Sequence, residues 1–144
     1  MKIVQLTAEN VKKLKVVRIR PDGSLVVIGG KNGQGKSSVL ECIMAALGGK
    51  KHVLPEAVRE GEKKGYTELD LDNGISIKRT FTKDGGGQLT ITNKEEGTSY
   101  SSPQAMLDKI VGKISFDPLM FARAGEKEQL EFLRHLTGLD FSEL

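Results

Sequence analysis

The run Leu25-Val26-Val27-Ile28 followed by Gly30-Lys31-Asn32-Gly33-Gln34-Gly35-Lys36-Ser37 decides the fold of this chain. A short apolar segment leads into a glycine-rich loop, and mostly apolar residues at 39–47 follow the loop. The order of strand, loop with Gly-Lys-Ser, and helix is that of a phosphate-binding loop. It predicts a nucleotide-binding chain of the α/β class, and the alternative is a glycine-rich turn that binds nothing.

The residue types of the loop fit the chemistry of a phosphate tail. Several backbone N–H groups must converge on the phosphates, and glycine leaves them room to approach. The Lys36 ammonium is placed to reach the β- and γ-phosphates, the Ser37 hydroxyl to bind Mg²⁺, and the positive end of the following helix to face the anion. The predicted cofactors are therefore ATP and Mg²⁺, with Ser37 as the metal ligand. The predicted nucleotide contacts in the loop are Gly30, Asn32, Gly33, Gln34, Gly35, Lys36, Ser37 and Ser38.

Composition sets broad limits on the class of protein. The 144 residues suit one domain, and 38% hydrophobic with 28% charged residues is typical of a soluble globular protein. The net charge of +3 permits nucleic acid as a partner without establishing it. The single cysteine, Cys42, excludes an intramolecular disulfide and suits a small buried side chain in a reducing compartment. Since no apolar stretch has the length of a membrane span, we expect a cytoplasmic protein without a membrane partner.

Periodicity and turn residues predict the other elements. Two short strands are expected at 3–6 and 15–19, joined by a polar connection over residues 7–13. A helix from about Lys36 is expected to end at Gly48-Gly49. An antiparallel β-meander is expected over about 66–93, with strands at 66–71, 75–81 and 89–92.

Two further helices complete the predicted elements. Ser102-Pro103 is a helix start, and the helix is expected over about 103–111, with Gly112 closing it. The last helix is expected over about 126–137, with Gly138 as its stop. The whole chain, 1–144, is interpreted as one lobe: a twisted sheet around the loop strand, the first helix on one face and the meander on its flank.

A P-loop ATPase also needs an acidic residue at the end of an apolar strand to hold Mg²⁺ or its water. The best candidate is Glu68-Leu69-Asp70-Leu71-Asp72, but its alternation is typical of a half-exposed antiparallel strand. Asn93-Lys94-Glu95-Glu96 is similar to a guanine-reading motif, although the acid is Glu rather than Asp. GTP is therefore a weak alternative, and this segment is more typical of a hairpin end.

The order of motifs resembles the N-terminal lobe of the SMC-like ABC-type ATPases, a group that includes the bacterial SbcC and RecF proteins of DNA repair and recombination. The motifs are Glu9-Asn10 near the end of a strand, the loop in its Asn-Gly-x-Gly-Lys-Ser-Ser form, Val58-Arg59-Glu60-Gly61, and Ile77-Lys78-Arg79 in the meander. Ser115-Phe116-Asp117-Pro118-Leu119 and Glu126-Lys127-Glu128-Gln129 are similar to short, phage-type members. The resemblance covers nearly the whole chain.

The resemblance implies an incomplete ATPase. In this family the chain continues through a coiled coil to a second lobe, which carries the signature motif and the acids of the hydrolytic site. This chain ends at Leu144, about where the coiled coil is expected to begin. No catalytic residue is therefore assigned, and hydrolysis is expected only with a C-terminal ATPase lobe and dimerised heads. The implied partners are that lobe, a second head in a homodimer, DNA and a nuclease.

The resemblance also bears on residues outside the loop. Lys13 is a candidate nucleotide contact, because family members have basic residues just after the first strand, and the alternative is an ordinary solvated loop. The glutamine that senses Mg²⁺ in the family is expected near residues 121–123, where none occurs, and Gln129 is expected to face solvent. Arg59 is interpreted as a structural anchor rather than a DNA contact. His52 and His135 lack neighbours at metal-ligand spacing.

Two other classes of function stay open. The first is a non-hydrolysing nucleotide-binding or interaction module that assembles with a separate lobe. Such a module would expose an apolar face or a strand edge, so it predicts self-association unless a partner covers that surface. The second is a small P-loop kinase, which is disfavoured because the arginines are scattered rather than gathered in a lid.

Overall fold

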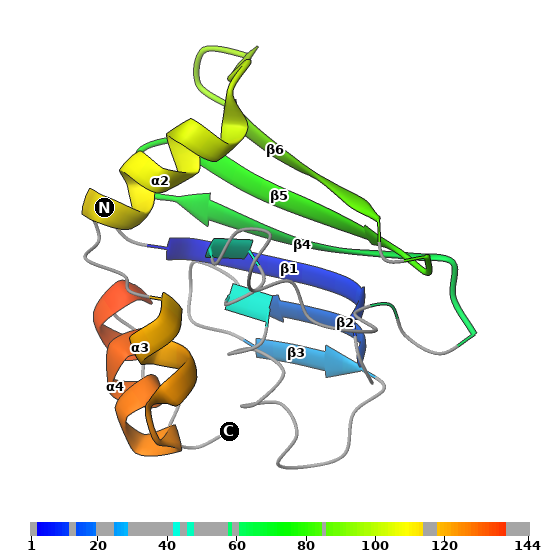
Figure 1. Ribbon diagram of the computed structural model, residues 1–144, viewed down its shortest axis with the longest axis vertical. Helices are drawn as coiled ribbons and strands as arrows, with labels where there is room; N and C mark the ends of the chain where they lie inside the picture. The colour runs from blue at the N-terminus through cyan, green and yellow to red at the C-terminus, as the bar shows by residue number, and fades with distance from the viewer. Residues whose placement is uncertain are drawn as a thin grey trace.

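The computed structural model describes residues 3–11, 14–19, 25–28, 42–43, 46–47, 58, 61–84, 86–113 and 118–137. Its centre is a seven-stranded sheet in which every neighbouring pair of strands is antiparallel (Figure 1). The order across the sheet is β3-β2-β1-β4-β5-β6-β7. The strands are β1 Ile3–Val11, β2 Leu14–Ile19, β3 Leu25–Ile28, β4 Lys64–Leu71, β5 Ile75–Thr82, β6 Gly87–Asn93 and β7 Thr98–Ser99.

The predicted β-meander is present as β4, β5 and β6. Alternation of apolar and polar residues along β4 places Leu69 and Leu71 on a buried face and the acidic Glu68 and Asp70 on the opposite face. The turn after β4 has Gly74 at φ 86°, and the Asn73 side chain accepts a hydrogen bond from the Ile75 N–H. Both are features of a tight hairpin, because glycine tolerates positive φ and asparagine bonds nearby backbone groups.

The first strand is longer than the sequence predicts. Residues 7–11, expected in a polar connection, continue β1 as far as Val11. The polar residues Thr7 and Glu9 alternate with the buried Ala8, so the segment is an amphipathic strand rather than a loop. Asn10 has φ 54°, a left-handed conformation that asparagine adopts more readily than most residues. Glu9-Asn10 therefore does lie near the end of the first strand, as expected.

The loop strand β3 occupies a different place from the one expected. The predicted sheet is built around this strand, whereas the described strands extend to one side of β3 only (Figure 1). The reason is the connectivity, because β1, β2 and β3 follow one another as antiparallel neighbours and the meander adds beyond β1.

One face of the sheet is covered and forms the core. Leu6, Leu69, Ile77 and Ile91 are side by side on this face according to the strand register, and each is at most 1% exposed. The helix α2, Pro103–Lys113, packs against this core through Leu107 and Ile110, which are buried as well. The opposite face carries mainly Thr, Ser and charged side chains at half-buried positions, which suits a surface in contact with water.

The described helices correct two details of the prediction. The helix α2 does not stop before Gly112 but runs to Lys113, since the exposed glycine simply adopts the helical conformation. The six-residue helix α3, Pro118–Arg123, was not predicted. It is too short for a periodic signal, and its marks in the sequence are Asp117, a residue type favoured at N-caps, and proline at its first position. In the part of the chain that the structure describes, no helix is long and apolar enough to cross a membrane.

The helices α3 and α4, Glu126–Thr137, form a pair beside the sheet (Figure 1). The rings of Phe121 and Phe132 pack with centroids 5.7 Å apart. The Gln129 side chain donates a hydrogen bond to the Phe121 carbonyl at 2.6 Å. The expectation that Gln129 faces solvent is therefore wrong, because the turn at Gly125 brings the first turn of α4 back to the last carbonyls of α3.

Candidate nucleotide-binding region

The predicted nucleotide contacts Gly30 to Ser38, together with Lys13, lie outside the described residues. The structure does describe elements on both sides of the loop. The strand β3 ends at Ile28, two residues before the loop, as the sequence predicts. Cys42, Ile43, Ala46 and Leu47, which follow the loop, are helical.

The helical residues after the loop are deeply buried. Cys42, Ile43, Ala46 and Leu47 are each at most 2% exposed and belong to the same hydrophobic core as the sheet. Their spacing puts all four on one side of a helix. The expectation of a small buried side chain at Cys42 is confirmed. The helix that follows the loop thus rests on the core through one continuous apolar face.

A hydrogen bond also joins this helix to the centre of the sheet. The Thr67 hydroxyl of β4 donates to the Cys42 carbonyl oxygen at 3.4 Å, and Thr67 is fully buried. The sequence gives little sign of this contact beyond the alternation of β4, which turns Thr67 to the covered face. Together with the apolar contacts, this bond positions the described helical residues relative to β4.

The acidic residues of β4 do not form a metal site. Lys94 lies 3.2 Å from the Glu68 carboxylate and 2.9 Å from that of Asp70, and the Ser76 hydroxyl also donates to Glu68. The hydrogen bond to Asp70 raises the pKa of Lys94 above its usual value, and Glu68 adds to this effect. β4 is antiparallel to both of its neighbours, so this strand has the character expected from its sequence.

The segment that resembles a guanine-reading motif is a hairpin end. The Asn93 side chain accepts hydrogen bonds from the backbone N–H groups of Glu95 and Glu96. Lys94 is occupied with the carboxylates of β4. Asn93 thus closes the turn and Lys94 joins it to β4, which agrees with the hairpin end predicted from the sequence.

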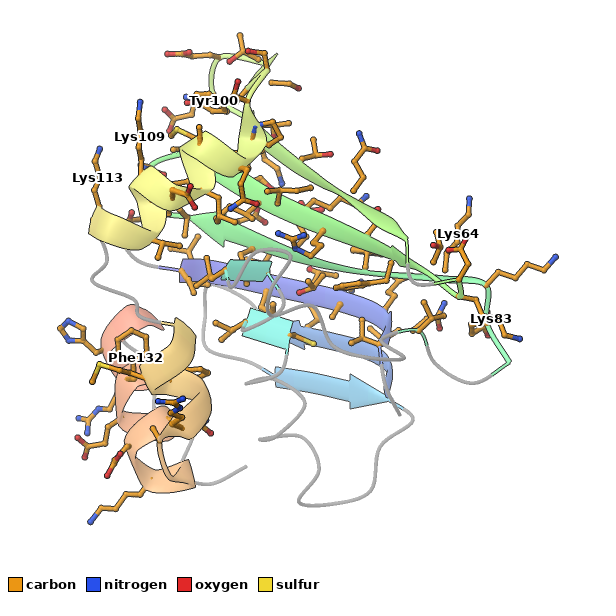
Figure 2. All side chains as sticks on the ribbon, viewed as in Figure 1. Lys64, Lys83, Tyr100, Lys109, Lys113 and Phe132 are labelled. Atoms are coloured by element: carbon orange, nitrogen blue, oxygen red, sulfur yellow. The ribbon has the colours of Figure 1, made fainter. Side chains whose placement is uncertain are left out.

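The remaining candidates are dispersed or lie outside the described part of the chain. Arg59 and His52 lie outside the described residues. His135 is exposed on α4, and among the described residues no group of His, Cys, Asp or Glu has the arrangement of a metal site. Exposed lysines are spread over the described surface: Lys64 and Lys83 lie at the open end of the β4–β5 pair and Lys109 and Lys113 on α2 (Figure 2), whereas Lys94 follows β6 and Lys127 belongs to α4.

One buried cation was not singled out by sequence reasoning. Arg79 of β5 is only 5% exposed, and burial lowers the pKa of its guanidinium. Within the described part of the chain, its Nε and Nη2 atoms have no hydrogen-bond acceptor. The alternation of β5 was the available signal, because Arg79 follows the buried Ile77 by two residues and must share its face.

Comparisons with known proteins show the family to which the chain belongs. The AAA domain family matches residues 5–139. The chain is 28% identical over 157 aligned positions to the DNA double-strand break repair Rad50 ATPase of Methanocaldococcus jannaschii, covering 97% of this chain and 16% of that protein. It is 29% identical over 140 positions to the DNA replication and repair protein RecF of Anaeromyxobacter dehalogenans, covering 92% of this chain and 37% of RecF.

Among solved structures, the recombination mediator protein RecF-ATPrS in the RecFOR pathway is similar to this chain. Its TM-score is 0.42 at 18% identity, covering 70% of this chain and 28% of that one. The chain thus spans well under half of the length of the relatives it matches. Both curated relatives belong to the group that the sequence motifs resemble, whereas the phage-type character stays a prediction.

Proposed function

Because this chain belongs to the AAA domain family, we propose that it binds ATP and Mg²⁺ through the loop Gly30–Ser37 and acts in DNA repair or recombination. In this proposal Lys36 contacts the phosphates, Ser37 holds the metal, and Lys13 approaches the nucleotide. The chain acts as the N-terminal part of an SMC-like ATPase head, and it hydrolyses ATP only together with a second lobe and a second head.

The observation that carries the proposal is the support behind the loop. A complete phosphate-binding sequence is followed by a helix whose Cys42, Ile43, Ala46 and Leu47 are buried in the core. A loop whose backbone N–H groups must converge on phosphates benefits from a fixed helix, because little ordering is then required on binding. The similarity to Rad50 and RecF supports the same function and adds DNA repair as its setting.

A second candidate is a nucleotide-binding module that does not hydrolyse ATP. It is favoured by the state of the acids on β4, because Glu68 and Asp70 are engaged with Lys94 on an antiparallel strand. Neither carboxylate is placed as a metal-binding residue at the end of a buried parallel strand. The two candidates differ in whether a C-terminal lobe restores turnover.

Calorimetric titration of the purified chain with ATP and with GTP, each with Mg²⁺, tests the proposal. Lys36→Ala removes a charge-assisted contact to the phosphates, so we expect ATP affinity to fall by about 10- to 100-fold. Glu68→Gln is the matched control, and we expect it to bind ATP as the unaltered chain does. Equal ATP binding by the Lys36→Ala variant would contradict the assigned loop, and no binding by the unaltered chain would contradict independent nucleotide binding.

An ATPase assay on the same samples separates the two candidates. The chain alone is expected to show no turnover. Addition of a C-terminal lobe of a related ATPase should restore turnover if the chain is part of a hydrolysing head, and should leave it absent if the chain is a binding module. Turnover by the isolated chain that is lost in Glu68→Gln would overturn the reading of β4.

A further inference from the structure

The buried guanidinium of Arg79 lies apart from the proposed nucleotide loop in sequence and has no described electrostatic partner. Arg79 belongs to β5 and is paired across the sheet with Thr67 on one side and Leu89 on the other. Its neighbours two positions away on its own strand are Ile77 and Phe81, which are buried. Among the described strand residues, its neighbours on this face are therefore apolar apart from Thr67, whose hydroxyl donates to the Cys42 carbonyl oxygen.

The acidic residues of the nearby strands lie on the other face. Glu68 and Asp70 of β4 alternate with the inward-facing Thr67 and Leu69, and Glu9 of β1 pairs with Tyr66 on that same open face. β5 and β6 contain no acidic residue. Within the described strands, no carboxylate thus shares the covered face with the guanidinium of Arg79. A buried charge in such a setting is costly unless an anion and hydrogen-bond acceptors compensate it.

The positions of Nε and Nη2, the two Arg79 nitrogens without an acceptor, indicate which kind of anion could pair with them. In the planar guanidinium, the N–H bonds of Nε and Nη2 point in parallel from one edge. This edge is the one that binds two oxygens of a carboxylate or a phosphate at once. Both atoms lack an acceptor in the described part of the chain. The Nε–H and Nη2–H groups of Arg79 therefore form one pair of donors that can bind a single oxyanion in a bidentate way.

We propose that the Nε–Nη2 edge of Arg79 is a binding site for a compact oxyanion, a phosphate or carboxylate group, separate from the nucleotide loop. The anion accepts both N–H bonds and neutralises the buried charge. Since Arg79 is 5% exposed, a free anion enters through local opening of the covering elements. A carboxylate supplied by the chain itself would have the same chemistry but would leave no room for an added anion.

The test uses inorganic phosphate on a chain in which the nucleotide loop is disabled. Unfolding midpoints of Lys36→Ala and of Lys36→Ala with Arg79→Met are measured in phosphate and in chloride of equal ionic strength. We expect phosphate to raise the midpoint of the first variant by several degrees more than that of the second. The second variant corrects for the general stabilising effect of phosphate. Equal rises in both would overturn the proposal.

A nuclear magnetic resonance titration gives a second readout if the double variant does not fold. The Nε–H signal of Arg79 in the Lys36→Ala chain is followed during addition of phosphate or of acetate, with Arg79→Lys used for assignment. A saturable shift with either anion supports the site, and the stronger ligand identifies the source. An Nε–H signal that neither anion moves would mean that a free oxyanion does not bind there. The unaltered chain is measured in phosphate as well, and a rise in its unfolding midpoint that is absent from Lys36→Ala would assign the effect to the nucleotide loop and overturn the proposal.

Discussion

Leu47→Ala tests whether the helix after the loop is held in the core. The Leu47 side chain is 2% exposed and packs in the hydrophobic cluster of the sheet. Replacing a fully buried leucine by alanine removes its transfer free energy and leaves a cavity, which costs about 2–5 kcal/mol. The free energy of unfolding of such a domain is only about 5–15 kcal/mol. A loss of about 3 kcal/mol is therefore a large part of the total.

The expected fall in the unfolding midpoint is about 10 °C for a loss of about 3 kcal/mol, given the unfolding entropy of a chain of this size. Met120→Ala is the matched control, because it removes a side chain of similar size from a helix at a position that is 69% exposed. We expect that variant to lie within about 0.5 kcal/mol of the unaltered chain. Thermal and urea unfolding followed by circular dichroism measure both. If Leu47→Ala costs no more than Met120→Ala, the helix does not rest on the core and the support proposed for the nucleotide loop is wrong.

Three further predictions concern the sheet and its connections. A Cβ at Gly65 would lie 2.5 Å from the Asn10 carbonyl oxygen, whereas one at Gly112 meets nothing within 4 Å; Gly65→Ala should therefore cost about 1–3 kcal/mol, and Gly112→Ala should gain about 0.5–1 kcal/mol in urea unfolding. Burial, with the charges of nearby carboxylates, raises the pKa of Tyr66 above its usual value. The protonated Tyr66 side chain therefore stabilises the fold below the unfolded pKa near 10, and this contribution is lost as the pH rises through the folded pKa. In Tyr66→Phe the free energy of unfolding should fall less above pH 10 than in the unaltered chain. Tyr100→Phe, which changes the only other tyrosine of the sequence, serves as the comparison. Lys94→Met should cost less than about 1 kcal/mol, because the Lys94 side chain is 55% exposed, and the cost should shrink at high salt; an equal or larger cost at high salt would contradict an electrostatic origin.

The sequence predicted most of the meander and the long helices because their signals are local. β4 and β5 alternate regularly and are joined by Asn73-Gly74, and α2 begins at Pro103 as expected. The extension of β1 was missed because its polar residues face water on one side of an amphipathic strand. The helix α3 was missed because six residues carry no reliable period.

The contacts that join distant segments were harder to predict. Gln129 bonds to Phe121 only because the α3–α4 turn returns the chain on itself, and nothing in the sequence around either residue states this. Thr67 and Arg79 are polar residues on the otherwise apolar covered face, and they differ in whether their polar atoms have hydrogen-bond partners. Thr67 is satisfied by a helix distant in sequence, whereas Arg79 lacks acceptors at two nitrogens among the described residues. At a polar residue on a buried face, the position in the fold differs from the one that the residue's own hydropathy predicts. Such positions are often functional.

The register of β4 decides whether Thr67 or Glu68 faces the helix that follows the nucleotide loop. Thr67 and Glu68 are adjacent in sequence but lie on opposite faces, one bonded to Cys42 and the other to Lys94. A shift of one residue would exchange the faces and bury a carboxylate under the helix. Gly65 stands against this shift, because only glycine fits beside the Asn10 carbonyl at the left-handed turn of β1. The hairpin at Gly74 fixes the other end of the strand. Gly65 and the hairpin at Gly74 thus fix the register of β4, the strand that hydrogen-bonds to the helix following the nucleotide loop.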